Sequence, residues 1–325
     1  MRYIKQEEDR QIELLKKQAI WFGNDQGGGI YRERSYPHLL EDRKYNLWEG
    51  LRFDAVEYFK RNKIKWHTYA HNLKSSQVAC VNHLMGIRKS KVLILKMLQA
   101  CAPKVEFVDL LPLPYETDET YIGFEVVSGG DWLNEGEPQR GSHCTSLDAL
   151  IYASDIEDKK WLILIEWKYT EHYYMQDKGT EADGKGEKRH ARYDALIQHS
   201  KFLKPQTKEA GSIYYQEPFY QLMRQTLWAE QIIHKTFTQV KPELEEKFKT
   251  KEEFKAAAML HLHIIPRANK YVVPRKFSRD PIEQIWRAQL NTPECYQVID
   301  PKDLFAPIAE ELDKDWMAYL EARYW

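Results

Sequence analysis

Two apolar runs joined by a short charged segment constrain this chain more than any other feature. The first run covers residues 146–153, the second covers 161–168, and a polar turn lies between them. This pattern is typical of a β-hairpin. Three charged residues stand within it: Asp148 near the start of the first run, and Glu166 and Lys168 at the end of the second.

The placement of these charges predicts a binding site. Side chains alternate along a strand, so Glu166 and Lys168 share one face. In an antiparallel pair Asp148 lies beside them, whereas a slip of one residue would turn them to opposite faces. Buried charges are costly unless they pair or bind something, and two carboxylates suit a hard cation. A surface hairpin carrying a simple ion pair is the alternative interpretation.

The same three residues resemble the motif of the PD-(D/E)XK, or restriction-endonuclease-like, nuclease superfamily. Seventeen residues separate Asp148 from Glu166-Trp167-Lys168, and both halves of the motif fall on predicted strands in the family's order. Leu147 stands where the family usually has a proline. The resemblance covers residues 121–231, and short motifs of this kind also occur by chance.

The resemblance implies metal-dependent phosphodiester hydrolysis. Asp148 and Glu166 would be ligands of Mg²⁺, for which Mn²⁺ would substitute, and the carbonyl of Trp167 would be a third ligand. Lys168 would orient or deprotonate the attacking water, or stabilise charge on the phosphorus.

Further site residues are expected on both sides of the motif, because 124–125 and 219–224 are similar to one branch of restriction endonucleases. Glu125 would be an extra metal ligand or a supporting acid; an exposed strand glutamate is the alternative. Gln221 and Arg224 are three residues apart, so they share one helix face. Arg224 could grip a substrate phosphate, or it could pair with Glu217 or Glu230.

Charge is distributed unevenly along a chain whose net charge is only −1. Residues 58–105 contain ten Lys or Arg and no Asp or Glu, whereas 106–139 contain nine acids and no Lys or Arg. The first block predicts a nucleic-acid-binding surface that includes Lys60, Arg61, Lys63 and Lys65. Alternatively, the two blocks pair with each other.

Composition indicates a folded protein outside the membrane. The chain has 325 residues, of which 43% are hydrophobic and 13% aromatic. No segment approaches the ~20 apolar residues of a membrane helix, and the charged N-terminus lacks a secretory signal. Four widely spaced cysteines give no zinc or disulfide pattern. We therefore expect a cytoplasmic protein without a membrane partner.

Periodicity and turn residues predict the order of the elements. We expect helices at 3–22, 47–59, 77–85, 89–100, 217–237 and 301–324, strands at 121–127, 147–153, 161–169 and 256–265, and a polar loop at 176–188. This order fits an α/β fold with a restriction-endonuclease-like αβββαβ core, in which helices flank a mixed central sheet. Residues 1–104 would form a mostly helical, basic region, and residues 105–325 the nuclease-like core.

His261 and His263 alternate with apolar residues in the last predicted strand and so share one side of it. A His-x-His pair can ligate a transition metal. No third ligand is near in sequence, and a half-polar strand face is the other interpretation.

These observations favour a metal-dependent nuclease, with DNA as substrate and a restriction or defence role. A catalytically inactive nucleic-acid-binding protein on a nuclease fold, a nuclease acting on RNA and an adaptor protein are the alternatives. The presence of all three motif residues argues against an inactive site. No sequence pattern specifies whether the chain acts as a monomer or as a homodimer.

Overall fold

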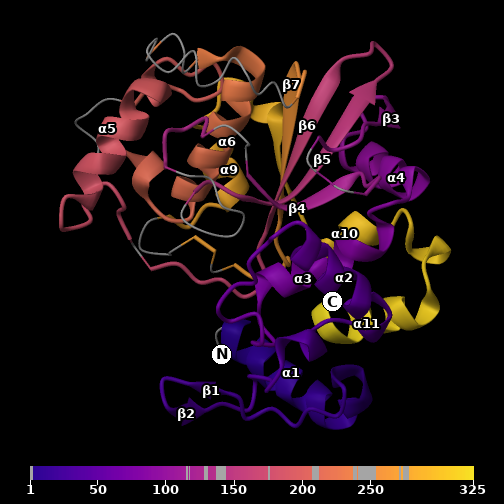
Figure 1. Ribbon diagram of the computed structural model, residues 1–325. Helices are drawn as coiled ribbons and strands as arrows, with labels where there is room; N and C mark the ends of the chain where they lie inside the picture. The colour runs from indigo at the N-terminus through magenta and orange to yellow at the C-terminus, as the bar shows by residue number, and fades with distance from the viewer. Residues whose placement is uncertain are drawn as a thin grey trace.

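The computed structural model shows an α/β fold built on one mixed sheet (Figure 1). It describes residues 3–114, 116, 118–127, 131–136, 144–174, 176–206, 212–236, 240, 254–270, 272–273 and 278–325.

The sheet has six strands: β3 (Phe107–Leu110), β4 (Ile122–Val126), β5 (Leu147–Asp155), β6 (Lys160–Trp167), β7 (Ala258–Ile264) and β8 (Tyr296–Ile299). Strand β5 pairs antiparallel with β3, β4 and β6. Strands β6, β7 and β8 run parallel to one another. The predicted hairpin is therefore β5–β6, and the predicted mixed sheet is confirmed.

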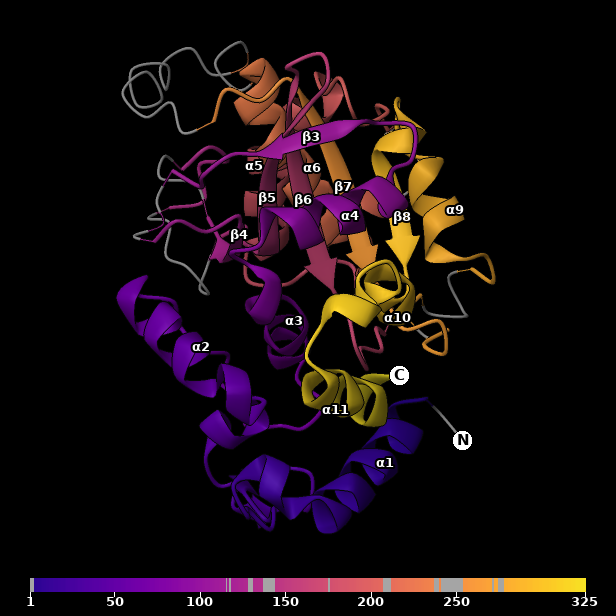
Figure 2. The same ribbon diagram turned by 90° about the vertical axis from the view of Figure 1, so that its right-hand side faces the viewer.

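Helices cover both faces of the sheet. Helices α5 (Lys185–Gln198), α6 (Phe219–His234) and α9 (Ile282–Arg287) lie on one side, and α4 (Lys91–Cys101) and α10 (Pro301–Phe305) on the other (Figures 1 and 2). Successive residues of β6 alternate between these layers. Leu162 and Leu164 pack in the α6 layer, whereas Ile163 and Ile165 pack against the other.

The first hundred residues are mostly helical, as predicted. They form α1 (Tyr3–Lys17), α2 (Glu49–Arg61), α3 (Ser76–Leu84) and α4, with a small hairpin of β1 (Ile30–Tyr31) and β2 (Arg34–Ser35). Ser75 and Ser90 cap α3 and α4, because their hydroxyls accept the backbone N–H groups of Val78 and Leu93.

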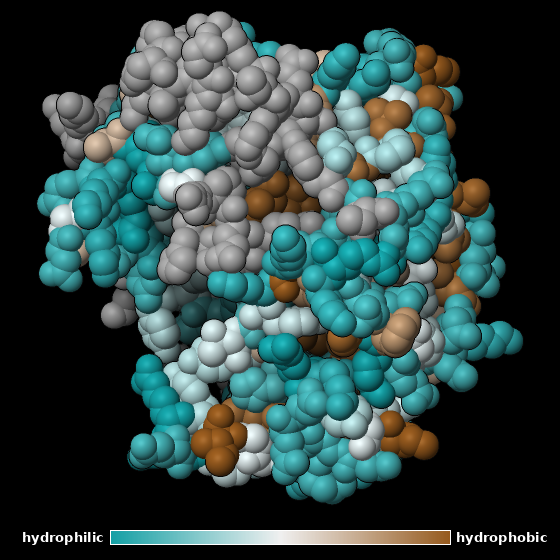
Figure 3. Space-filling model, viewed as in Figure 1, coloured by the Kyte–Doolittle hydropathy of each residue, from teal (hydrophilic) through white to brown (hydrophobic). Residues whose placement is uncertain are grey.

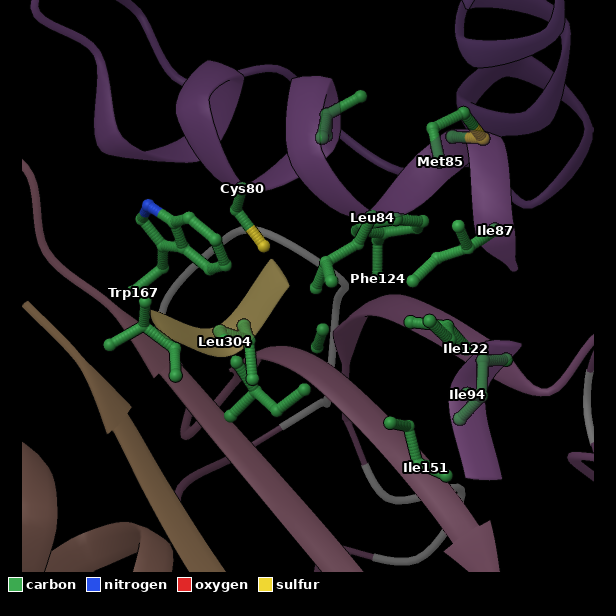
Figure 4. Packing of buried hydrophobic residues seen from close by; sticks show 14 of the residues in the cluster. Cys80, Leu84, Met85, Ile87, Ile94, Ile122, Phe124, Ile151, Trp167 and Leu304 are labelled. Atoms are coloured by element: carbon green, nitrogen blue, oxygen red, sulfur yellow. The ribbon is translucent and has the colours of Figure 1, made fainter. Parts of the chain in front are cut away.

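One hydrophobic cluster joins these N-terminal helices to the sheet. Cys80 and Leu84 of α3 and Ile94 of α4 lie in the same cluster as Ile151 of β5 and Trp167 of β6 (Figure 4). The division at residue 104 into two regions stays a prediction. The face shown in Figure 3 is mainly hydrophilic, since the apolar side chains of the sheet are buried between the layers.

The predicted helix at 301–324 is wrong as a single element. The structure has α10 and then α11 (Lys314–Tyr324). Pro307 follows the end of α10, where a proline cannot donate to the helix ladder and disfavours helical geometry before it. Asp313 then caps α11 by accepting the N–H of Trp316 at 2.8 Å. Elements β3, β8, α5 and α9 were not predicted, and the predicted loop at 176–188 overlaps the start of α5.

Candidate active site

The β5–β6 hairpin places the two motif carboxylates on one face of the sheet. Ala149 pairs with Ile165 and Leu150 with Leu164, so the register carries Asp148 opposite Glu166. The backbone nitrogen of Trp167 donates to Oδ2 of Asp148 at 2.7 Å, which extends the contact between the strands. The slip that would have separated the carboxylates does not occur.

Glu125 joins them from β4. Phe124 pairs with Ala149 and Val126 with Leu147, so Glu125 lies level with Asp148. Its φ of 48° is left-handed, which is uncommon for a residue other than glycine and is often found at functional sites. The alternative of an exposed strand glutamate is wrong, because the residue is only 3% exposed.

Three groups hold the Glu125 carboxylate. Gln77 of α3 donates to Oε1 at 2.6 Å, and the hydroxyl of Ser146 donates to Oε2 at 3.1 Å. His67 Nε2 lies 3.3 Å from Oε1, and this hydrogen bond raises the pKa of His67. The N-terminal helical region thus reaches directly into the site.

Lys168 continues the ladder beyond β6, since its backbone N–H donates to the carbonyl of Ile264 at 2.8 Å. Its Nζ lies 2.5 Å from Oε1 of Glu166 and donates to Oε1 of Gln221 at 2.6 Å. Burial lowers the pKa of Lys168, but the neighbouring acidic groups, Glu166 first among them, together outweigh burial and hold the pKa well above the ordinary value. Lys168 is therefore a fixed positive charge.

The two motif carboxylates repel each other. Burial, followed by the charge of Glu166, raises the pKa of Asp148 well above its ordinary value. The other oxygen of Glu166, Oε2, accepts a hydrogen bond from Gln225 of α6. Because Lys168 neutralises only part of this charge, the pair has the character of a cation-binding site.

These side chains line one cleft of about 310 Å³. Its walls come from the sheet, from α6 and from the N-terminal region, and they comprise His67, Ser76, Glu125, Cys144, Ser146, Asp148, Glu166, Lys168, Glu217, Tyr220, Gln221, Arg224 and Gln225. Over the described part of the chain, no group of three or more His, Cys, Asp or Glu side chains is arranged to hold a metal ion. The predicted ligand set needs only two carboxylates, completed by the Trp167 carbonyl and waters.

Comparison with known protein families shows which family the chain belongs to. The model of a family described as restriction endonuclease associating with ARP matches residues 15–325. The chain belongs to this restriction endonuclease family. Searches of curated proteins and of solved structures found no match. The predicted restriction-endonuclease-like resemblance is confirmed at the level of the family.

Two predicted substrate-binding residues of this family member have protein partners. Gln221 holds Lys168, as described above. Arg224 donates to Oγ1 of Thr145 at 3.0 Å and lies 3.5 Å from Oε1 of Glu135. It forms no ion pair with Glu217 or Glu230 among the described residues, so that alternative is wrong.

The basic block lies mostly away from the cleft of this family member. Lys60, Arg61, Lys63 and Lys65 are exposed at and beyond the end of α2 and do not line the cleft. Arg61 forms an ion pair with Asp118, and Lys91 pairs with Asp109 at 2.7 Å. The two charge blocks therefore pair in part, as the alternative interpretation expected.

Four residues in or behind the cleft escaped sequence analysis as functional groups: His67, Glu217 and Gln225, which line it, and Gln77, which holds Glu125. Only Gln225 left a local signal, because it follows Gln221 by four residues and so shares its helix face. His67 and Gln77 come close to the family's motif only through tertiary packing. His261 and His263 are buried and do not line the cleft.

Proposed function

We propose that this chain is a metal-dependent nuclease that cleaves DNA as a restriction or defence endonuclease. The observation that supports this proposal most is the meeting of Asp148, Glu166 and Lys168 at one end of the hairpin, in a cleft. The restriction endonuclease family membership points to the same activity.

Mg²⁺, with Mn²⁺ as substitute, fits the donor set of this cleft. Asp148 and Glu166 offer hard oxygen ligands, and their mutual repulsion favours a bound cation. The carbonyl of Trp167 would be the third protein ligand. Bound there, the ion supplies charge neutralisation at the phosphate and a more acidic water.

Lys168 acts in this proposal as a charge stabiliser, not as a base. Its raised pKa keeps the ammonium protonated at neutral pH, and Glu166 and Gln221 fix its position. A fixed ammonium stabilises the negative charge that develops on the phosphate oxygens. Glu125 supports the site from β4, held by Gln77 and Ser146.

Substrate and partners follow from the same proposal. Arg224 lines the cleft, where its guanidinium would contact a phosphate, and the basic block would add contacts farther along the DNA. The family's description names an association with ARP, which we extend to this chain. No described helix is long and apolar enough to cross a membrane. A DNA-cleaving role would place the protein in the cytoplasm.

Purified protein incubated with plasmid, linear and single-stranded DNA, and with RNA, tests the proposal. Each substrate is offered with Mg²⁺, with Mn²⁺ and with EDTA. We expect cleavage of DNA that requires the divalent ion. Cleavage that persists in EDTA, or cleavage of RNA alone, contradicts the proposal as stated.

A further inference from the structure

Glu217 is a cleft carboxyl that the proposed metal site does not use. It directly precedes α6, and its backbone nitrogen donates to the carbonyl of Gln176 at 3.1 Å. The side chain lines the same cleft as Asp148 and Glu166, yet it is only 9% exposed. Its Oε2 atom is buried and has no hydrogen-bond partner among the described residues. Such a group is costly unless a ligand satisfies it.

The charges around Glu217 come from three elements. Lys168 follows β6, Lys178 lies in the segment after β6, and Arg224 belongs to α6. These three cations favour the ionised form of the Glu217 carboxyl, whereas the negative charge of Glu166 disfavours that form. Burial is the largest influence, and it raises the pKa of Glu217 above its ordinary value. Across the cleft lie His67 and Glu125, already bound to each other.

We propose that Glu217 is the catalytic acid that protonates the leaving oxygen when the phosphodiester bond breaks. This inference rests on the proposed nuclease function. The attacking water oxygen forms a bond to phosphorus, and its proton passes to solvent. The bond from phosphorus to the bridging oxygen breaks, its electron pair stays on that oxygen, and the oxygen takes the proton of Glu217. The carboxylate regains a proton from solvent before the next turnover.

The two cationic donors of α6 and the motif, Arg224 and Lys168, are less suited to this step. An effective general acid has a pKa near the working pH. Lys168 is held by two acceptors and its pKa is raised further, so it gives up a proton poorly. Arg224 does not deprotonate in proteins. The pKa of Glu217 is raised, and its Oε2 atom has no hydrogen-bond partner among the described residues.

A purely structural role for Glu217 is the competing explanation, because an acidic residue near a helix N-terminus favours the helix dipole. A substrate with sulfur in place of the leaving bridging oxygen separates the two roles. Thiols are much more acidic than alcohols, so a thiolate leaves without needing a proton. The ends of the wild-type cleavage products show which bridging oxygen must be replaced.

The experiment compares Glu217→Gln, Glu217→Asp and the wild-type protein on both substrates. We expect Glu217→Gln to lower kcat on the oxygen substrate by about 10²–10⁴-fold. On the sulfur substrate it should cleave nearly as fast as wild type, and Glu217→Asp should recover part of the loss. Glu187→Gln, an exposed residue of α5, is the matched control and should behave as wild type on both.

The outcomes are distinguishable. Equal losses on the two substrates, or no loss on either, overturn the assignment of Glu217 while leaving the nuclease proposal standing. A wild-type protein that cleaves neither substrate contradicts the proposed function itself and removes this inference with it. A pH profile provides a second readout: the loss of rate at high pH should flatten in Glu217→Gln.

Discussion

The backbone nitrogen of Trp167 donates a 2.7 Å hydrogen bond to Oδ2 of Asp148. This contact ties the aspartate to the residue that lies between Glu166 and Lys168. It fixes the register of β5 and β6 at the point where one slip would turn the carboxylates to opposite faces. In the proposed metal site Oδ1, which does not accept this hydrogen bond, would be the ligand atom of Asp148.

Substitution of the motif residues should abolish cleavage without unfolding the protein. Asp148→Asn keeps an oxygen that can accept the Trp167 N–H, so the strand register should persist. We expect Asp148→Asn, Glu166→Gln and Lys168→Ala each to lower kcat by at least about 100-fold, because the first two remove a carboxylate ligand of the proposed metal ion and the third removes the ammonium that stabilises charge on the phosphate. Cleavage assays with circular dichroism as the folding control test this. Near-normal cleavage by any one folded variant would remove that residue from the site.

Divalent ions should stabilise the wild-type protein but not the ligand variants. A ligand that binds only the folded state adds about 2.7 kcal/mol of stability at 100 times its Kd. We therefore expect Mg²⁺ or Mn²⁺ to raise Tm relative to EDTA, and expect the increase to vanish in Asp148→Asn and Glu166→Gln. This measurement does not depend on activity. An equal rise in Tm in all three proteins would mean that the ion binds elsewhere.

Glu125 should contribute to the rate without being essential. Its carboxylate is held by Gln77, Ser146 and His67 and lies level with Asp148. Residues that support metal ligands typically contribute 10–100-fold, so we expect Glu125→Gln to lose about that much activity. Single-turnover cleavage at saturating Mg²⁺ measures it. A loss as complete as that of Asp148→Asn would instead make Glu125 an essential ligand.

The sequence was sufficient for the local part of the site. The β5–β6 hairpin follows from strand alternation and a polar turn, which fix Asp148, Glu166 and Lys168 on one side. The sequence did not predict strands β3 and β8, because each has only four residues, which is too few to show an alternating pattern. It did not predict α5 either, because most residues of that helix are polar.

The rest of the site depends on long-range packing. Gln77 reaches Glu125 from 48 positions away, and nothing in either local pattern indicates that contact. The left-handed φ of Glu125 likewise arises from its surroundings, since glutamate has no preference for it. Arg224 contacts Thr145 and Glu135, which are distant in sequence and brought to it by tertiary packing, instead of Glu217 or Glu230, which are nearer in sequence.

The exposed lysines beyond the cleft should set the salt dependence of DNA binding. The logarithm of the binding constant for DNA falls linearly with the logarithm of the salt concentration, and each phosphate contact makes this slope steeper by about 0.9. Replacing Lys60, Lys63 and Lys65 with Gln should weaken binding and flatten that slope by up to three such increments. Arg61 is left out because it forms a close ion pair with Asp118 of the acidic block, whereas Lys60 lies at a longer 4.0 Å from Glu57 of its own helix.

Lys91→Gln and Lys96→Gln are the matched controls for this prediction. Both lysines belong to the same basic block, but they pair with Asp109 and Glu311 at 2.7 Å. We expect the controls to leave the slope unchanged. Equal slopes for the wild type and the triple variant would favour the interpretation in which the block serves only to pair with acids of the chain.

His261 should limit stability in mild acid. The residue lies in β7 opposite Leu164, and neither ring nitrogen has a hydrogen-bond partner among the described residues. Burial lowers its pKa from 6.5 to about 4. Between these two values the unfolded chain binds a proton that the folded protein does not, so stability should fall as pH drops from 6.5 towards 4.

His261→Leu removes the imidazole that takes up a proton in the unfolded chain, and it removes the two buried nitrogens that have no hydrogen-bond partner among the described residues. We expect the substitution to stabilise the protein by about 1–3 kcal/mol at pH 7.5, where His261 is neutral in both the folded and the unfolded chain, and by more at pH 5. Urea unfolding at the two pH values measures the difference. His263→Leu is the contrast, because it breaks the 2.8 Å hydrogen bond between Nδ1 of His263 and the Tyr296 hydroxyl and should destabilise the fold. If His261→Leu is instead the less stable protein at both pH values, its ring nitrogens are bonded to buried water, and β7 carries an internal polar site.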